Sequence, residues 1–206
     1  MARRSKGRIG YVHVPDMAAH GWAEFHRLIG QATRCEGVIV DVRFNGGGHT
    51  SELIIERLMR RVIGWGFGRH FDEPLPYPGQ GMRGPVVFVT NPYAGSDGDI
   101  VTGAAQNLGL GPVIGERSWG GTVGIDGRFE LVDGTVVTQP RYAHCFDKQA
   151  FGLENHGTDP DIVVAMGPSE WESDDDCQLD RAIDEILARL AQTPAATPPS
   201  FDPPRV

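Results

Sequence analysis

The residues best suited to chemistry lie in the segment 84–103, GPVVFVTNPYAGSDGDIVTG. The apolar, β-branched run Val86–Val89 predicts a buried strand, and a turn and then a helix are predicted around Ser96. A serine at such a turn is held above the sheet, where the first amides and the dipole of the helix stabilise negative charge. This arrangement suits a nucleophile. The alternative is an ordinary helix cap, because Ser96 with Asp97 and Asp99 is also good capping chemistry.

A second glycine-rich turn, Asn45 to Gly48, also follows a predicted strand and precedes a predicted helix. Its backbone amides are suited to binding an oxyanion. Binding of a phosphate is the other chemistry that such a turn offers, but the chain has neither the G-x-G-x-x-G spacing nor a Walker lysine here. A plain tight turn is the remaining interpretation.

The elements that must position these turns alternate along the chain. Strands are predicted at 8–14, 38–42, 86–89, 112–114 and 161–164, and helices at 17–32, 50–63, after 96 and after 176. A long loop that lines a cleft, with room for one short edge strand, is expected at 64–84. A hairpin is expected at 127–139, with strands at 129–132 and 135–138 that turn at Asp133-Gly134. Repeated strand–turn–helix units with short connections predict one α/β domain with parallel strand pairing.

The composition of the 206 residues limits the function classes. The net charge of −8 argues against nucleic-acid binding, and no apolar run reaches the length of a membrane helix. The three scattered cysteines form neither a disulfide framework nor a metal-ligand spacing, which favours a reducing cytoplasm and no bound metal. We expect a basic extension or artificial start at 1–6, a core domain at 7–192 and a Pro-rich, disordered tail at 193–206.

Three motifs in order resemble the tricorn-protease group of serine peptidases, which are relatives of the carboxyl-terminal processing peptidases. They are DVRFNGGGHTSE, VTNPYAGSDGDIVTGAAQNLGLGPVIGERSWGGTVG and FGLENHGTDPD, and the resemblance runs from about Gly7 to Leu190. It implies an α/β domain of the crotonase/ClpP-like fold, built from repeated strand-strand-helix units. It also implies a peptidase that acts on peptides, without a cofactor, in a cytoplasmic homo-oligomer.

The resemblance gives several residues a role. Ser96 matches the nucleophile, and the amide of Asp97 matches one donor of the oxyanion hole. A glycine amide of the turn Gly46-Gly47-Gly48 matches the other donor, and the resemblance does not say which glycine provides it. Glu154, in LENHG, matches a carboxylate that acts through a second serine on the catalytic histidine.

The chain departs from the group in its general base. In the group, the histidine and the second serine come from an earlier core segment, which a PDZ-like domain separates from this one. Residues 1–14 match neither, so we expect the base from an upstream segment or another chain. The lysine of the processing branch has no match in the stretch 118–122. His49 and His156 are the candidate substitutes within the chain.

Two other functions stay open on the sequence. One is a catalytically inactive, truncated peptidase core that binds peptides or serves as an assembly module. The other is a crotonase-like acyl-CoA enzyme, because that chemistry also places two backbone amides around a thioester oxygen.

Overall fold

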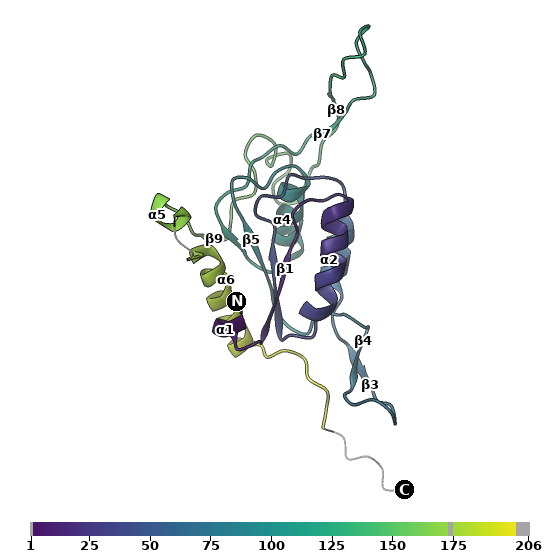
Figure 1. Ribbon diagram of the computed structural model, residues 1–206, viewed down its shortest axis with the longest axis vertical. Helices are drawn as coiled ribbons and strands as arrows, with labels where there is room; N and C mark the ends of the chain where they lie inside the picture. The colour runs from purple at the N-terminus through teal and green to yellow at the C-terminus, as the bar shows by residue number, and fades with distance from the viewer. Residues whose placement is uncertain (1, 173–174, 201–206) are drawn as a thin grey trace.

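The computed structural model describes residues 2–172 and 175–200. A five-stranded sheet lies at its centre, in the order β1-β2-β5-β6-β9 with every neighbouring pair parallel (Figure 1). Its strands are β1 (Ile9–His13), β2 (Gly37–Asp41), β5 (Val86–Thr90), β6 (Val113–Gly115) and β9 (Ile162–Val163). The helices are α1 (Ala2–Ser5), α2 (Ala19–Ala32), α3 (Ser51–Met59), α4 (Asp97–Leu108), α5 (Pro168–Trp171) and α6 (Cys177–Gln192). The predicted parallel α/β architecture is therefore confirmed.

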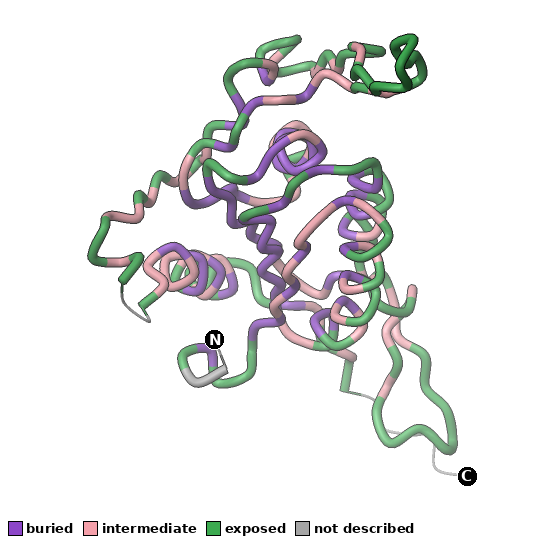
Figure 2. Tube along the Cα trace, turned by 45° about the horizontal axis from the view of Figure 1, so that its top comes forward, coloured by how far each residue is buried: buried purple, intermediate pink, exposed green. Residues whose placement is uncertain are grey.

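The central strands β2 and β5 are buried on both faces because helices cover both sides of the sheet. On one face, Val40 and Phe88 pack with buried residues of α2, α3 and α4. On the other face, Ile39 and Val87 pack against α6, where Ile186 is completely buried. Figure 1 shows α2 and α6 on opposite sides of the sheet, and Figure 2 shows the buried residues concentrated between them. Continuous apolar strands of this kind are typical of parallel sheets.

The helix predicted at 50–63 is shorter than expected, since α3 ends at Met59. Arg60 is extended, and its carbonyl accepts the amide of Met82 at 2.7 Å. The carbonyl of Met82 in turn accepts the amide of Val62 at 3.1 Å. This backbone pairing leads into the small antiparallel hairpin of β3 (Gly64–Gly66) and β4 (Leu75–Tyr77). Pairing with a distant segment therefore ends the helix.

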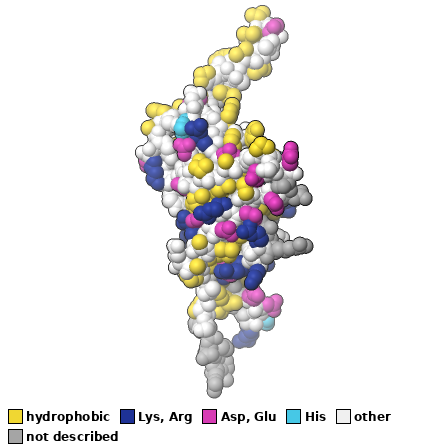
Figure 3. Space-filling model, turned by 90° about the vertical axis from the view of Figure 1, so that its left-hand side faces the viewer, with side chains coloured by type: hydrophobic (Ala, Val, Ile, Leu, Met, Phe, Trp, Pro, Cys, Tyr) yellow, Lys and Arg dark blue, Asp and Glu magenta, His cyan; other side chains and the backbone are white. Residues whose placement is uncertain are grey.

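A second hairpin, of β7 (Gly124–Asp126) and β8 (Gln139–Tyr142), projects from the body of the domain (Figure 1). The strands predicted at 129–132 and 135–138 are wrong, because only a single bridge, Glu130 to Val136, joins them. No layer covers this part of the described chain, and Val132 is fully exposed. Figure 3 shows apolar atoms along the projecting hairpin. An alternating pattern without a core face has no burial to drive strand pairing.

Both ends of the described chain contact the domain. Arg4 forms ion pairs with Asp180 and Asp184 of α6. In the segment predicted to be disordered, Ala195 is buried and the amide of Ala196 donates to the carbonyl of Arg83 at 2.7 Å. The first residues of this segment therefore pack on the domain, whereas 201–206 lie outside the described residues. Within the described ranges, no helix has the length and apolar character needed to cross a membrane.

Arg43 links the end of β2 to the start of α6. Its guanidinium contacts the carboxylates of Asp41 and Asp176, each at 2.7 Å, and its side chain is 11% exposed. Asp176 also caps α6 by accepting the amide of Leu179 at 2.9 Å. Although burial alone would raise the pKa of Asp176, the ion pair with Arg43 and this amide hold it below its ordinary value of 3.8.

We predict that Arg43→Met lowers the free energy of unfolding by about 3–5 kcal/mol at pH 7, because it leaves the buried carboxylate of Asp41 without its charged partner. The contribution of Asp176 is present above pH 3.8 and is lost as the pH falls through its depressed folded-state pKa. The difference between variant and wild type therefore shrinks in acid. Urea unfolding at several pH values measures both effects.

Arg8→Met is the control, because it removes an exposed ion pair with Glu36. It should change the stability far less than Arg43→Met. Equal losses in the two variants would contradict the account of Arg43.

Candidate active site

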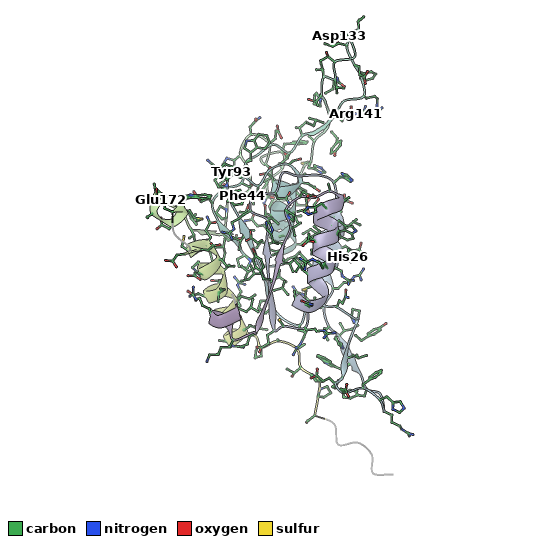
Figure 4. The ribbon with its side chains drawn as sticks, in the orientation of Figure 1. His26, Phe44, Tyr93, Asp133, Arg141 and Glu172 are labelled. Atoms are coloured by element: carbon green, nitrogen blue, oxygen red, sulfur yellow. The ribbon has the colours of Figure 1, made fainter. Side chains whose placement is uncertain are left out.

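The turn that carries Ser96 follows β5 and has an unusual backbone. Ser96 has φ 55° and ψ −119°, a conformation that is costly for a residue with a side chain. The side-chain oxygen of Asn91 supports the approach to this turn, because it accepts the amides of Phe44 at 3.0 Å and Tyr93 at 3.2 Å. The rings of Phe44 and Tyr93 stack on each other, and Figure 4 labels the two residues in the same part of the molecule. The hydroxyl of Ser96 makes no capping hydrogen bond, which argues against the simple helix-cap interpretation.

The glycine-rich turn after β2 is fixed beside Ser96 by Asn45, which is completely buried. The Asn45 side chain donates to the carbonyl of Val14 at 2.8 Å and accepts the amide of Gly47 at 2.9 Å. Its backbone carbonyl accepts the amide of Gly95 at 2.9 Å. A Cβ at Gly47 would lie 2.5 Å from Cβ and 2.9 Å from Oγ of Ser96. The two turns predicted from the sequence therefore meet at van der Waals distance.

The amides of this turn differ in availability. The Gly47 amide is engaged by Asn45, whereas no acceptor among the described residues takes the amides of Gly46 and Gly48. Met17 bonds to Gly47 and His49 on either side of Gly48. In a parallel bridge of this kind, the amide of the middle residue points away from the partner strand. The Gly48 amide is therefore free to bind a ligand.

Asp97, the first residue of α4, joins the starts of two helices. Its carboxylate accepts the amide of Ser51 at 2.9 Å and also the Ser51 hydroxyl, and it is 5% exposed. Ser51 is the first residue of α3. The carboxylate thus caps α3, while the Asp97 amide has no acceptor in the described part of the chain.

Glu154 is held by the loop that contains Thr122 and Val123. Its Oε2 accepts the amides of Thr122 at 2.6 Å and Val123 at 2.7 Å and the Thr122 hydroxyl at 3.1 Å. Burial acts to raise the pKa of Glu154, but these hydrogen bonds together hold it below its ordinary value of 4.5. Glu154 is therefore ionised at neutral pH. The sequence offers no signal that Thr122 is its partner.

The two candidate histidines do not reach Ser96 by any hydrogen bond within the described residues. The His156 ring contacts Asp159 at 2.6 Å through Nε2 and Arg117 at 3.5 Å through Nδ1. His49 is exposed, and its backbone amide donates to the carbonyl of Met17 at 2.7 Å. A substitute base within the chain thus finds no support in these contacts.

Asp99 is a buried carboxylate that the sequence shows only as a capping residue. It is 0% exposed and accepts the Ser118 hydroxyl and the amides of Gly120 at 2.9 Å and Gly121 at 3.2 Å. Burial raises the pKa of Asp99, and these bonds, together with the amide of Ser96, act in the opposite direction. Its partners lie about twenty residues away in the sequence, which is why local patterns do not reveal them.

Comparison with known proteins matches the chain to a peptidase family. Residues 8–164 match the sequence profile of peptidase family S41. The chain is 53% identical over 198 residues to tricorn protease homolog 1 of Streptomyces coelicolor, covering 96% of this chain and 18% of that protein. It is 49% identical over 192 residues to the tricorn protease of Thermoplasma acidophilum, covering 91% of this chain and 17% of that protein. The chain thus spans less than a fifth of these relatives.

Solved structures agree. The crystal structure of the tricorn protease superposes with a TM-score of 0.89 at 48% identity, covering 92% of this chain and 18% of that one. A putative peptidase from Parabacteroides merdae superposes with a TM-score of 0.64 at 25% identity, covering 90% of this chain and 63% of that one.

We predict that Gly47→Ala destabilises the protein by about 1–3 kcal/mol, because φ is +89° there and the new Cβ would collide with Ser96. Gly46→Ala is the matched control, since a Cβ at Gly46 meets nothing within 4 Å. Thermal unfolding of both variants measures the difference. A stability of Gly47→Ala equal to that of Gly46→Ala would contradict the close contact between the turns.

Proposed function

Because the chain belongs to peptidase family S41, we propose that it is the core of a tricorn-like serine peptidase that cleaves peptides with Ser96 as the nucleophile. The observation that carries this proposal is the contact between the two turns. This contact sets the hydroxyl of Ser96, which makes no capping hydrogen bond, beside the glycine-rich turn at the start of α4.

In this proposal, Ser96 Oγ attacks the carbonyl carbon of the peptide bond and its proton passes to a general base. The carbonyl electron pair moves to oxygen, and the resulting oxyanion accepts the amides of Asp97 and Gly48. Both amides are free in the described structure, and the start of α4 adds its dipole. Collapse of the intermediate breaks the C–N bond and expels the amine, which takes the proton from the base, and leaves an acyl ester on Ser96 Oγ. Water then attacks this ester through the same base and oxyanion site, which releases the carboxylic acid and restores the Ser96 hydroxyl.

Glu154 orients the base in this proposal. Its Oε2 is occupied by Thr122 and Val123, whereas Oε1 accepts no hydrogen bond from the described residues. An ionised oxygen of this kind suits the hydroxyl of a second serine that holds a histidine. We place both of these groups in a segment outside residues 1–206 or in another chain, since the contacts of His49 and His156 give neither residue a link to Ser96.

The finer aspects of the fold and setting belong to the same proposal. A parallel sheet with helices on both faces is consistent with the crotonase/ClpP-like class of repeated strand-strand-helix units. The relatives are named tricorn proteases, which supports peptides as substrates. Assembly into a homo-oligomer and a cytoplasmic location belong to the proposal through the resemblance of the sequence motifs. Neither the family match nor these relatives favour the acyl-CoA enzyme or the inactive binding module.

A test of this proposal is labelling of the chain by a fluorophosphonate, followed by intact mass, with and without added imidazole. Without a histidine nearby, Ser96 is a weak nucleophile, so we predict slow labelling by the chain alone. Free imidazole can act as the missing base, so labelling should accelerate and reach one probe per chain. Ser96→Ala should abolish labelling in both conditions.

The variants His49→Ala and His156→Ala separate the two sources of the base. Both should label at the wild-type rate, because the base lies elsewhere. Loss of labelling in either variant would place the base within this chain. A folded wild-type chain that stays unlabelled even with imidazole would exclude Ser96 as the nucleophile.

A further inference from the structure

We propose that Asp99 is a positioning residue of this site, which clamps the loop 118–123 to the helix of Ser96 and thereby fixes Glu154 relative to Ser96. The inference rests on the proposed function, since Ser96 and Glu154 take their roles from it. Asp99 itself touches neither the substrate nor the base in this account.

Hydrogen-bond donors of one loop surround the Asp99 carboxylate. Its Oδ1 accepts the Ser118 hydroxyl and the amide of Gly120, and its Oδ2 accepts the amide of Gly121. Asp99 lies three residues after Ser96, in the first turn of α4. One side chain therefore binds three groups of the loop to the helix that begins at the nucleophile.

The same loop also holds Glu154. Directly after Gly121, the amides of Thr122 and Val123 donate to Glu154 Oε2. The carbonyl of Gly120 also accepts the amide of the residue after Glu154, at 2.7 Å. A shift of the loop must therefore move Glu154, because both sets of contacts lie on six consecutive residues, 118–123.

Thr158 provides a second connection between α4 and the loop 118–123. The Thr158 hydroxyl donates to the backbone carbonyl of Asp99 at 3.0 Å, and the Thr158 amide donates to Ser118 Oγ at 2.8 Å. Thr158 and Ser118 are both buried. The chain that follows Glu154 is thus tied directly to the backbone of α4, and through Ser118 to the Asp99 carboxylate.

Burial of the Asp99 carboxylate costs free energy. A carboxylate at the start of a helix needs no burial to stabilise the helix dipole, since exposed acids there do so. Asp99 is nevertheless 0% exposed, which disfavours its charged form. Both oxygens of Asp99 accept hydrogen bonds, so this position requires a carboxylate. The NH₂ group of an asparagine would face the amide of Gly121, and both of these groups are donors.

The experiment follows the titration of the Glu154 carboxyl by carbon-13 NMR in wild type and in Asp99→Asn, with Glu154→Gln to assign the signal. In wild type, we expect the pKa of Glu154 below 4.5, because of the amides of Thr122 and Val123. In Asp99→Asn, the loop shifts, these bonds weaken, and the pKa of Glu154 rises toward 4.5 or above. Fluorophosphonate labelling of Ser96 in the presence of imidazole should slow about tenfold or more.

Asp161→Asn is the matched control. Its carboxylate also accepts a backbone amide, that of Val113 at 2.8 Å, but at the amino end of β6. This variant should leave the Glu154 titration unchanged. If Asp99→Asn does not fold, Ser118→Ala keeps the carboxylate and removes one donor, so a smaller rise of the Glu154 pKa is expected.

An unchanged Glu154 titration in a folded Asp99→Asn or Ser118→Ala variant would overturn the inference. The titration does not depend on labelling of Ser96. A wild-type chain that cannot be labelled would therefore contradict the proposed function, while the Glu154 pKa would still decide whether Asp99 clamps the loop.

Discussion

The site depends on how closely two backbone turns approach each other. The glycine-rich turn and the Ser96 turn come from neighbouring parallel strands, β2 and β5, and meet where no additional carbon atom would fit between Gly47 and Ser96. This closeness explains why residue 47 has no side chain, and both Gly47 and Ser96 have positive φ. It also brings the glycine-rich turn beside the start of α4, and neither the Gly48 amide nor the Asp97 amide has an acceptor among the described residues.

Buried polar side chains keep the two turns in this contact. Asn45, Asp97 and Asp99 each connect segments far apart in the sequence, and each is at most 5% exposed. Burial of a polar group is costly unless its hydrogen bonds are made, and the side-chain oxygens of these three residues accept hydrogen bonds mainly from backbone amides. Such a network fixes donors before a substrate arrives, which is what stabilisation of an oxyanion requires.

The sequence predicts the sheet and most of the helices, because these follow from local apolar patterns and from parallel pairing, whereas the meeting of the two turns is implied only by the resemblance of the motifs. Prediction from the sequence fails where a distant partner decides the outcome. Pairing with Met82 ends the helix that the apolar stripe continues to residue 63, and the absence of a covering layer in the described chain leaves the alternating stretch 129–138 almost unpaired. The same limit hides Thr122 and the partners of Asp99, since neither residue type nor spacing announces a contact twenty or thirty residues away.

The most direct measurement of the central claim is a crystal structure of the chain with a peptidyl phosphonate bound to it. The account predicts a covalent bond to Ser96 Oγ, with one phosphonyl oxygen within hydrogen-bond distance of the amides of Asp97 and Gly48. A phosphonate bound to Ser96 with that oxygen directed to solvent, or bound to a different residue, would contradict it.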